Sequence, residues 1–230
     1  MFEQFSSRSL ELERLDSGEY TSAEYVRWTR EMWYIHRFFG EIRAMRKSLI
    51  ADIYKRRIKN VSVVDVGAGS GGLLSALRNQ LSGVQISTVG IEMNADAAKS
   101  MHAASIHAVR ADAIRLPFAD ASFDYAMCSL FLHHLDEHSA TLLLREMGRV
   151  ARRGIYVIDL NRSPIPYYFY KFFGRIFLQR FTVEDGALSI RRAYRPTELL
   201  ELSDAAGLTS VTIKRSAINR LVLSGKGKNR

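Results

Sequence analysis

The sequence predicts an α/β protein built on a mostly parallel sheet, and three observations carry this prediction. A β-branched apolar run at residues 61–66 stops at a group of glycines, as a buried parallel strand does before a tight turn into a helix. Further apolar runs, at residues 84–91 and 154–160, alternate with segments of helical periodicity. The last two runs, at residues 208–214 and 218–224, are joined by a turn short enough for an antiparallel hairpin.

Length and composition indicate one domain with an appended cap, since 230 residues suffice for both. The only cysteine, Cys128, cannot form a disulfide within the chain, which indicates a reducing compartment. The first residues carry charges where a secretory signal needs an apolar core, and no apolar stretch is long enough to span a bilayer. We therefore expect a cytoplasmic protein, and the sequence leaves its oligomeric state open.

The formal net charge of +9 is concentrated near the end of the chain, where residues 151–230 hold 15 basic and 6 acidic side chains. A solvated basic surface explains this excess without any partner. An acidic acceptor, an anionic membrane surface or nucleic acid would explain it as a binding surface. The charge alone does not choose between these explanations.

The glycine turn after the first strand predicts a nucleotide cradle, because glycines let a ligand approach main-chain N–H groups closely. Its spacing, Gly67-x-Gly69-x-x-Gly72, with Glu92 twenty residues beyond, is also that of a dinucleotide site. However, Asp65 stands at the strand tip, where a carboxylate would repel a bound pyrophosphate. The same carboxylate suits S-adenosylmethionine, which carries a sulfonium and an ammonium group and no phosphate.

These residues resemble the first motif of the class I S-adenosylmethionine-dependent methyltransferases, and in particular the type 11 group with small-molecule acceptors. By this resemblance, Glu92 accepts hydrogen bonds from the ribose hydroxyls and Asp112 accepts one from the adenine amino group. The segment at residues 122–131 resembles the strand that contacts the methionine portion. The expected cofactor contacts are Asp65, Gly67, Ala68, Gly69, Glu92, Met93, Asp112, Ala113, Cys128 and Ser129.

The resemblance also implies a Rossmann-like sheet of seven strands in the order 3-2-1-4-5-7-6, flanked by helices, with the seventh strand antiparallel to the rest. Residues 1–60 precede the first strand, and their apolar side chains recur at helical spacing, so we expect a helical cap there. Residues 61–230 then form the methyltransferase domain, with an aromatic insertion at about residues 162–195. The matching motifs cover about residues 61–160.

Two adjacent histidines, His133 and His134, follow the fourth predicted strand directly. Open α/β sheets bind ligands at this strand edge, and histidine can take a proton near neutral pH. The resembled family commonly has a histidine here, although many members use it only to shape the pocket. Three roles stay open for this pair: catalytic base for a hydroxyl acceptor, pocket wall, and packing at the entry to the next helix.

The segment at residues 164–181 is aromatic or aliphatic nearly throughout, and Lys171, Arg175 and Gln179 form one narrow polar stripe. Burial in the fold explains such a helix, as does a lid over an apolar acceptor or an interfacial position at a membrane. In the resembled family, insertions after the fifth strand build the acceptor pocket. The expected acceptor contacts are Arg162, Tyr168, Phe172 and Arg192.

The leading hypothesis is a methyltransferase that acts on the oxygen of an aromatic or lipid-like small molecule. An RNA or protein methyltransferase is the second, but residues 128–131 lack the Asn/Asp-Pro-Pro-aromatic run used on base amino groups, and no RNA-binding module is visible. We therefore expect no nucleic-acid partner. A cofactor-binding scaffold without turnover is disfavoured by the intact motifs. We expect no metal ion, whereas peripheral membrane contact is compatible with the aromatic segment.

Overall fold

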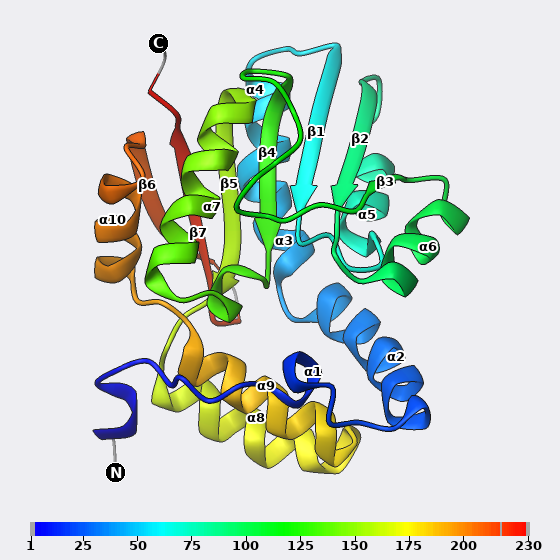
Figure 1. Cartoon of the computed structure of the whole chain (residues 1–230), viewed down its shortest axis with the longest axis vertical. Helices are drawn as coiled ribbons and strands as arrows, with labels where there is room; N and C mark the ends of the chain where they lie inside the picture. Colours follow the sequence, from blue (N-terminus) through cyan, green and yellow to red (C-terminus); the bar gives the residue numbers. More distant parts are fainter. Residues whose placement is uncertain (1–2, 217, 229–230) are drawn as a thin grey trace.

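The computed structural model describes residues 3–216 and 218–228, and within them one sheet of seven strands forms the centre of the molecule (Figure 1). The strand order is β3-β2-β1-β4-β5-β7-β6, with β7 antiparallel to both neighbours and the other pairs parallel. This arrangement confirms the predicted fold. The strands are β1 Asn60–Val66, β2 Gln85–Ile91, β3 His107–Val109, β4 Phe123–Ser129, β5 Ala151–Leu160, β6 Thr209–Ser216 and β7 Arg220–Lys226.

Helices surround the sheet, and three of them begin at side chains that cap their free N–H groups. Thr21 forms a capping box with Glu24 at the start of α2, Asn94 accepts from the N–H groups of Asp96 and Ala97 in α6, and Asp136 accepts a hydrogen bond of 2.7 Å from the N–H of Ser139 in α7. The helices are α1 Arg14–Ser17, α2 Ser22–Phe38, α3 Glu41–Met45, α4 Ala51–Lys55, α5 Gly72–Gln80, α6 Ala95–Ala103, α7 Glu137–Val150, α8 Pro164–Phe177, α9 Arg180–Arg192 and α10 Pro196–Ala205.

Both faces of the sheet are buried, which explains why its central strands are apolar at nearly every position. Val63 in β1 points to the face covered by α3 to α6, where it meets Leu77 of α5. Its neighbour Val64 points to the opposite face, where Met147 of α7 lies in the same core cluster. Alternate residues of each strand thus contact different helix layers.

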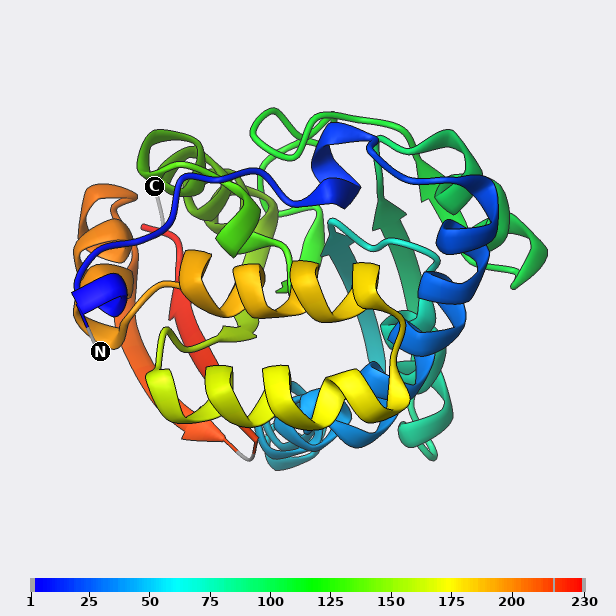
Figure 2. The ribbon, with the colours of Figure 1, turned by 90° about the horizontal axis from the view of Figure 1, so that it is seen from below.

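A third group of helices, α1, α2, α8 and α9, lies beyond the carboxyl ends of the parallel strands (Figures 1 and 2). The first sixty residues therefore have two positions: α2 belongs to this cap, whereas residues 41–58 pack against the sheet. Arg8 holds the N-terminal segment in place, because it donates hydrogen bonds to the carbonyls of Arg192, His133 and Leu135. The cap is thus built from two parts of the chain: α1 and α2 from the first sixty residues, and α8 and α9 from the predicted insertion.

The aromatic segment differs from the simplest expectation of a buried helix. It divides into α8, which ends at Phe177, and the start of α9, and the two helices pack side by side (Figure 2). Only one side of α8 is covered, and the buried residues of the helix are Tyr167 and Gly174. Six of its large apolar side chains are exposed, namely Ile165, Phe169, Phe172, Phe173, Ile176 and Phe177. Among the described residues, no helix combines the length and apolar character that crossing a membrane requires.

Candidate active site

A cavity of about 880 Å³ lies between the carboxyl edge of the sheet and the cap. The glycine turn, the ends of β2 and β4, and helices α2, α8 and α9 contribute to its wall. The apolar face predicted for α2 forms part of this wall through Tyr25, Trp28, Met32 and Ile35. The helical periodicity at the start of the chain therefore shapes a binding cavity as well as a packing surface.

The glycine turn has the shape of a ligand cradle. Gly67 and Gly69 have φ values of 74° and 53°, in the left-handed region that favours glycine. A Cβ atom at Gly67 would lie only 2.4 Å from the ring of Phe131, whereas at Gly69 it would meet no atom within 4 Å. Gly67 is therefore needed for packing, and Gly69 leaves its backbone open to the cavity.

Glu92 is fixed beside this turn by two backbone N–H groups. One of its carboxylate oxygens accepts a hydrogen bond of 3.0 Å from the N–H of Gly69, and the other accepts one of 2.9 Å from the N–H of Asn94. The two donors belong to the glycine turn and to the start of α6. The carboxylate of Glu92 therefore borders the cavity in a fixed orientation.

Asp65 lies at the end of β1 with only 2% of its surface exposed. Its Oδ1 atom has no hydrogen-bond partner among the described residues. Burial, together with the nearby carboxylates Glu41 and Glu92, raises the pKa of Asp65 well above its usual value. A buried, unpaired oxygen at the cavity wall fits a ligand with an ammonium group, as S-adenosylmethionine has.

A further carboxylate, Glu41, was missed by sequence reasoning. It follows Gly40 at the start of α3, is buried, and accepts a hydrogen bond from the Ser129 hydroxyl while pairing with Nδ1 of His36. Glu41, Ser129 and His36 all line the cavity. The only local signal was the helix break at Gly40, because the contacts of Glu41 depend on strands far along the chain.

Four other predicted cofactor residues lie outside the lining of the cavity. Cys128 is fully buried in the core between the sheet and α7, because strand alternation turns it away from Ser129. Ala113 also belongs to this core, whereas Met93 and Asp112 are exposed. Asp112 accepts a hydrogen bond of 3.1 Å from the N–H of Ile114. A cofactor role for these four stays a prediction.

The two histidines lie in a short turn, Leu132–His134, directly after β4. Nδ1 of His133 is 2.6 Å from Oδ1 of Asp159, and the backbone N–H of His133 donates to the other oxygen of the same carboxylate. Nδ1 of His134 is 3.0 Å from both oxygens of Asp16. Each imidazole is therefore held at Nδ1 by a carboxylate, which leaves its Nε2 atom for the cavity.

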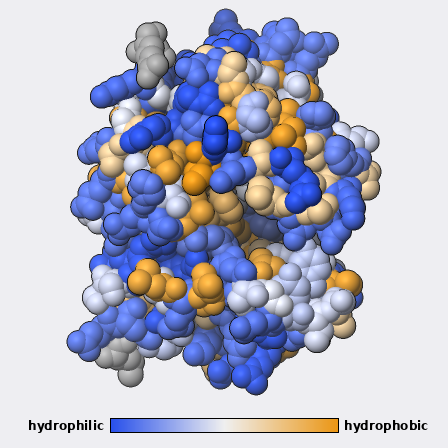
Figure 3. All heavy atoms as spheres, in the orientation of Figure 1, coloured by the Kyte–Doolittle hydropathy of each residue, from blue (hydrophilic) through white to orange (hydrophobic). Residues whose placement is uncertain are grey.

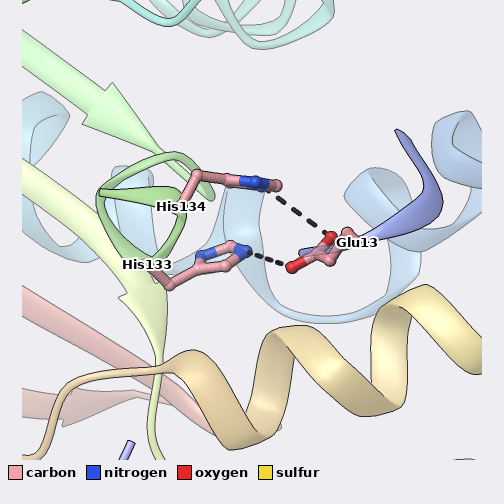
Figure 4. A group of neighbouring side chains, drawn as sticks. All are labelled: Glu13, His133 and His134. Carbon is pink, nitrogen blue, oxygen red and sulfur yellow. Dashed lines mark ion pairs between the residues drawn. The ribbon is translucent and has the colours of Figure 1, made fainter. Parts of the chain in front are cut away.

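Both Nε2 atoms point toward Glu13, a residue of the N-terminal segment (Figure 4). The Nε2 atom of His133 is 3.8 Å from one oxygen of Glu13, and that of His134 is 4.0 Å from the other. Burial raises the pKa of Glu13 to about 7. Sequence reasoning missed Glu13, because no motif surrounds it and only the folded chain brings it to the histidines.

The structure places the two predicted acceptor arginines behind the cavity wall. Arg162 is buried and forms an ion pair with Glu198, and it also donates to the carbonyl of Ala193. Arg192 is buried as well and donates to the carbonyl of His134 and to Asp16. Arg162 therefore holds the chain around Ala193 and Glu198, Arg192 holds the histidine turn, and direct contact with an acceptor stays a prediction for both.

The two aromatic residues predicted to contact the acceptor, Tyr168 and Phe172, also lie outside the cavity lining. Tyr168 and Phe172 are 41% and 67% exposed on the outer side of α8. Their neighbours Phe169, Tyr170 and Ile165 do line it. The helix itself thus borders the cavity, as expected, but through different side chains.

Comparison with known proteins agrees with this geometry. Residues 64–158 match the protein family described as methyltransferase domain. The match includes the glycine turn, Glu92 and the histidine turn. This part of the chain therefore matches a methyltransferase domain, and the strand order of the sheet is that of the class I S-adenosylmethionine-dependent methyltransferases. S-Adenosylmethionine is the cofactor of this class, and the cradle and the buried carboxylates described above fit it.

Individual relatives cover the methyltransferase domain to different extents. Demethylmenaquinone methyltransferase from Staphylococcus aureus is 29% identical over 131 residues, which are 54% of this chain and 52% of that protein. The chain thus spans about half the length of the curated relatives it matches. A Thermotoga maritima structure, described as an S-adenosylmethionine-dependent methyltransferase and possible histamine N-methyltransferase, has a TM-score of 0.61 at 19% identity and covers 90% of this chain and 95% of its own. An Aquifex aeolicus methyltransferase has a TM-score of 0.58 at 14% identity, with 83% and 92% covered. These structures support the fold.

Proposed function

We propose that the chain transfers the methyl group of S-adenosylmethionine to an oxygen atom of a small aromatic or lipid-like acceptor. One observation carries the proposal: a single cavity joins the buried carboxylates at the glycine turn to the histidine turn. Asp65 and Glu92 border its cofactor end, and His133 and His134 border the other. The cofactor supplies an electrophilic methyl group, so the protein has to bring an acceptor atom into line with it.

The residues of this chain supply alignment and exclusion of water. Asp65, Glu41 and Glu92 bind the charged and hydroxyl groups of the cofactor, while Trp28 and Met32 of α2 close the cavity from the cap side. A hydroxyl acceptor must also lose its proton. The Nε2 atoms of the two histidines are the groups that act on the acceptor oxygen, because carboxylates occupy both Nδ1 atoms.

An apolar acceptor is supported by the entrance of the cavity. Val26, Ile165, Phe169 and Ile218 line the cavity and are also 55–79% exposed, so its mouth has an apolar border. Figure 3 shows a hollow between the sheet and the cap with apolar atoms around it. The curated relatives are named for demethylmenaquinone, a lipid-like small molecule. This border and the exposed side of α8 also support the proposed peripheral contact with a membrane, from the cytoplasmic side.

The proposal is tested by identifying a bound acceptor. Ligand that co-purifies with the protein is identified by mass spectrometry and then supplied with cofactor that carries a labelled methyl group. Labelled product with the label on oxygen is the expected result. Transfer to a carbon or nitrogen atom would correct the acceptor atom, and failure to transfer to any co-purified compound would contradict the proposal.

A matched pair of variants tests the acceptor wall. Phe169→Ala removes a ring that lines the cavity, whereas Phe172→Ala removes a comparably exposed ring from the outer side of the same helix. We expect Phe169→Ala to raise the acceptor KM several-fold more than Phe172→Ala, with cofactor affinity unchanged in both. A larger effect at Phe172, or at Tyr168, would restore the contacts predicted from sequence and place the acceptor on the outer side of α8.

A further inference from the structure

The cluster of Glu13, His133 and His134 has the composition and spacing of a metal site. One carboxylate oxygen and one nitrogen from each imidazole lie within 4.8 Å of one another. Bonds of about 2.1 Å in a tetrahedral site separate neighbouring ligand atoms by about 3.4 Å. The distances of 3.8 and 4.0 Å run from the two nitrogens to different oxygens of Glu13, and with a single oxygen every separation stays within 4.8 Å. Shortening each separation by at most about 1.4 Å would therefore bring three atoms onto one ion.

The surroundings of the two imidazoles also match those of metal ligands. A histidine that binds a metal commonly donates its other ring N–H to a carboxylate, which fixes the ring and its tautomer. Asp159 has this position for His133, and Asp16 has it for His134. The two Nε2 atoms are thus free to face Glu13, each toward one of its carboxylate oxygens (Figure 4).

The charges of the cluster favour a cation. Three carboxyl groups, those of Glu13, Asp16 and Asp159, face the two imidazoles, whereas the guanidinium of Arg192 is the basic group paired with Glu13 and Asp16. Acidic groups thus outnumber the guanidinium in a largely buried place. Moreover, Oε1 of Glu13 is buried without a hydrogen-bond partner among the described residues, and a metal ion would supply one.

We infer that Glu13, His133 and His134 bind a divalent transition-metal ion of the zinc type at the acceptor end of the cavity. Two nitrogen ligands and one oxygen ligand select such ions over Mg²⁺ and Ca²⁺, which prefer oxygen alone. Three protein ligands leave a coordination position open, and it faces the cavity. We expect the acceptor oxygen to bind at this open position, and only this part of the inference rests on the proposed function. Metal binding itself does not depend on it.

Binding is measured on the whole chain after treatment with a chelator and removal of any affinity tag. Calorimetry with Zn²⁺ should give one equivalent, and Co²⁺ should give the visible absorption bands of a site with nitrogen and oxygen ligands. Asp159→Asn keeps all three ligands but loses the carboxylate behind His133, so it should weaken Zn²⁺ binding roughly 10- to 100-fold. Glu13→Gln and His133→Gln should weaken it at least as much. His36→Gln, which removes a histidine from another part of the cavity wall, is the matched control and should bind Zn²⁺ as the parent does.

Thermal unfolding and S-adenosylmethionine binding establish that each variant is folded. Absence of Zn²⁺ binding to the parent chain, or affinity equal in the parent, Glu13→Gln and His133→Gln, would overturn the inference. Methyl transfer that is complete in the metal-free protein and unchanged by added Zn²⁺ or Co²⁺ would overturn the role of the ion in binding the acceptor oxygen and would return proton removal to an imidazole. That last result would leave the proposed function intact. Metal binding without any methyl transfer would support the metal site and contradict the proposed function.

Discussion

Buried carboxylates at the two ends of the sheet differ in how completely they are paired. Asp124 lies at the amino end of β4 and Asp65 at the carboxyl end of β1, and they are 3% and 2% exposed. Asp124 accepts hydrogen bonds from Ser62, Arg152 and Arg153, whereas Asp65 keeps an oxygen without a partner among the described residues. The two carboxylates are thus equally buried, but only Asp124 has hydrogen-bond partners for both of its oxygens.

This contrast separates scaffold from binding site. Native proteins pair nearly all buried polar atoms, so an unpaired carboxylate oxygen needs an explanation. The hydrogen bonds from Arg152, Arg153 and Ser62 outweigh burial and hold the pKa of Asp124 below its usual range. The unpaired oxygens of Asp65 and Glu13 both border the cavity at the other end of the sheet. We therefore expect mutations at the amino end to change stability and mutations at the carboxyl end to change ligand binding or turnover.

The largest effect is expected at the histidine turn. Loss of a group that handles the acceptor proton costs roughly 10²–10⁴-fold in rate, so His133→Ala should lower the turnover number by that amount. S-Adenosylmethionine affinity should stay within a few-fold of the parent, as measured by calorimetry. His133→Gln should be as inactive as His133→Ala, since an amide can neither take the proton nor replace the imidazole on a metal. A Gln variant with at least a tenth of the parent turnover would reduce His133 to a pocket wall.

Asp124→Asn should show the opposite profile. We expect it to lower the free energy of unfolding by about 3 kcal/mol, the low end for a broken buried ion pair, because Arg152 and Arg153 are half-exposed. Turnover per folded molecule should be unchanged. Denaturant unfolding with parallel activity assays checks both, and a large loss of turnover would break the comparison.

The pH dependence of this loss follows from the direction of the pKa shift. The folded-state pKa of Asp124 is lowered, so its carboxylate stabilises the fold above the unfolded-state pKa of about 3.9. The difference between the parent and Asp124→Asn should be complete above about pH 5 and shrink as the pH falls below that value. Unfolding free energies measured from pH 7 down to pH 3 test this. A difference that stays constant across the range would remove ionisation of Asp124 as its cause.

The same division explains what the sequence could predict. Asp65 and the glycine turn belong to one strand–turn–helix pattern, and Glu92 ends the next parallel strand, so their position followed from the order of elements along the chain. Glu13 reaches the site through the folded cap and Glu41 through the packing of α3 against the sheet, and no local pattern marks either residue. The sequence did not show that Ser129 lines the cavity and Cys128 does not, because a motif names consecutive residues whereas a strand turns alternate ones to opposite faces. Likewise, the composition of α8 indicated an apolar helix without showing which side is covered.

At the cofactor end, Glu92→Ala should cost about 1.5–3 kcal/mol of S-adenosylmethionine affinity, the range for hydrogen bonds to a charged group. The parent should also bind the demethylated product, and should bind NAD more weakly than either, because the carboxylates repel a pyrophosphate. Calorimetry measures all of these. An unchanged dissociation constant in Glu92→Ala would remove Glu92 from the site, and tighter binding of NAD would reverse the choice of cofactor.

The smallest effects sharpen the comparison from the scaffold side. Arg152 and Arg153 both donate to Oδ1 of Asp124, and their side chains are 50% and 41% exposed. Each arginine can therefore compensate in part for loss of the other, and each single Ala variant should lose less than about 1 kcal/mol of unfolding free energy. The double variant leaves the buried carboxylate with Ser62 alone, so its loss should exceed the sum of the two single losses. Strict additivity in urea unfolding would show that the arginines act independently, and that Asp124 is satisfied by Ser62 without them.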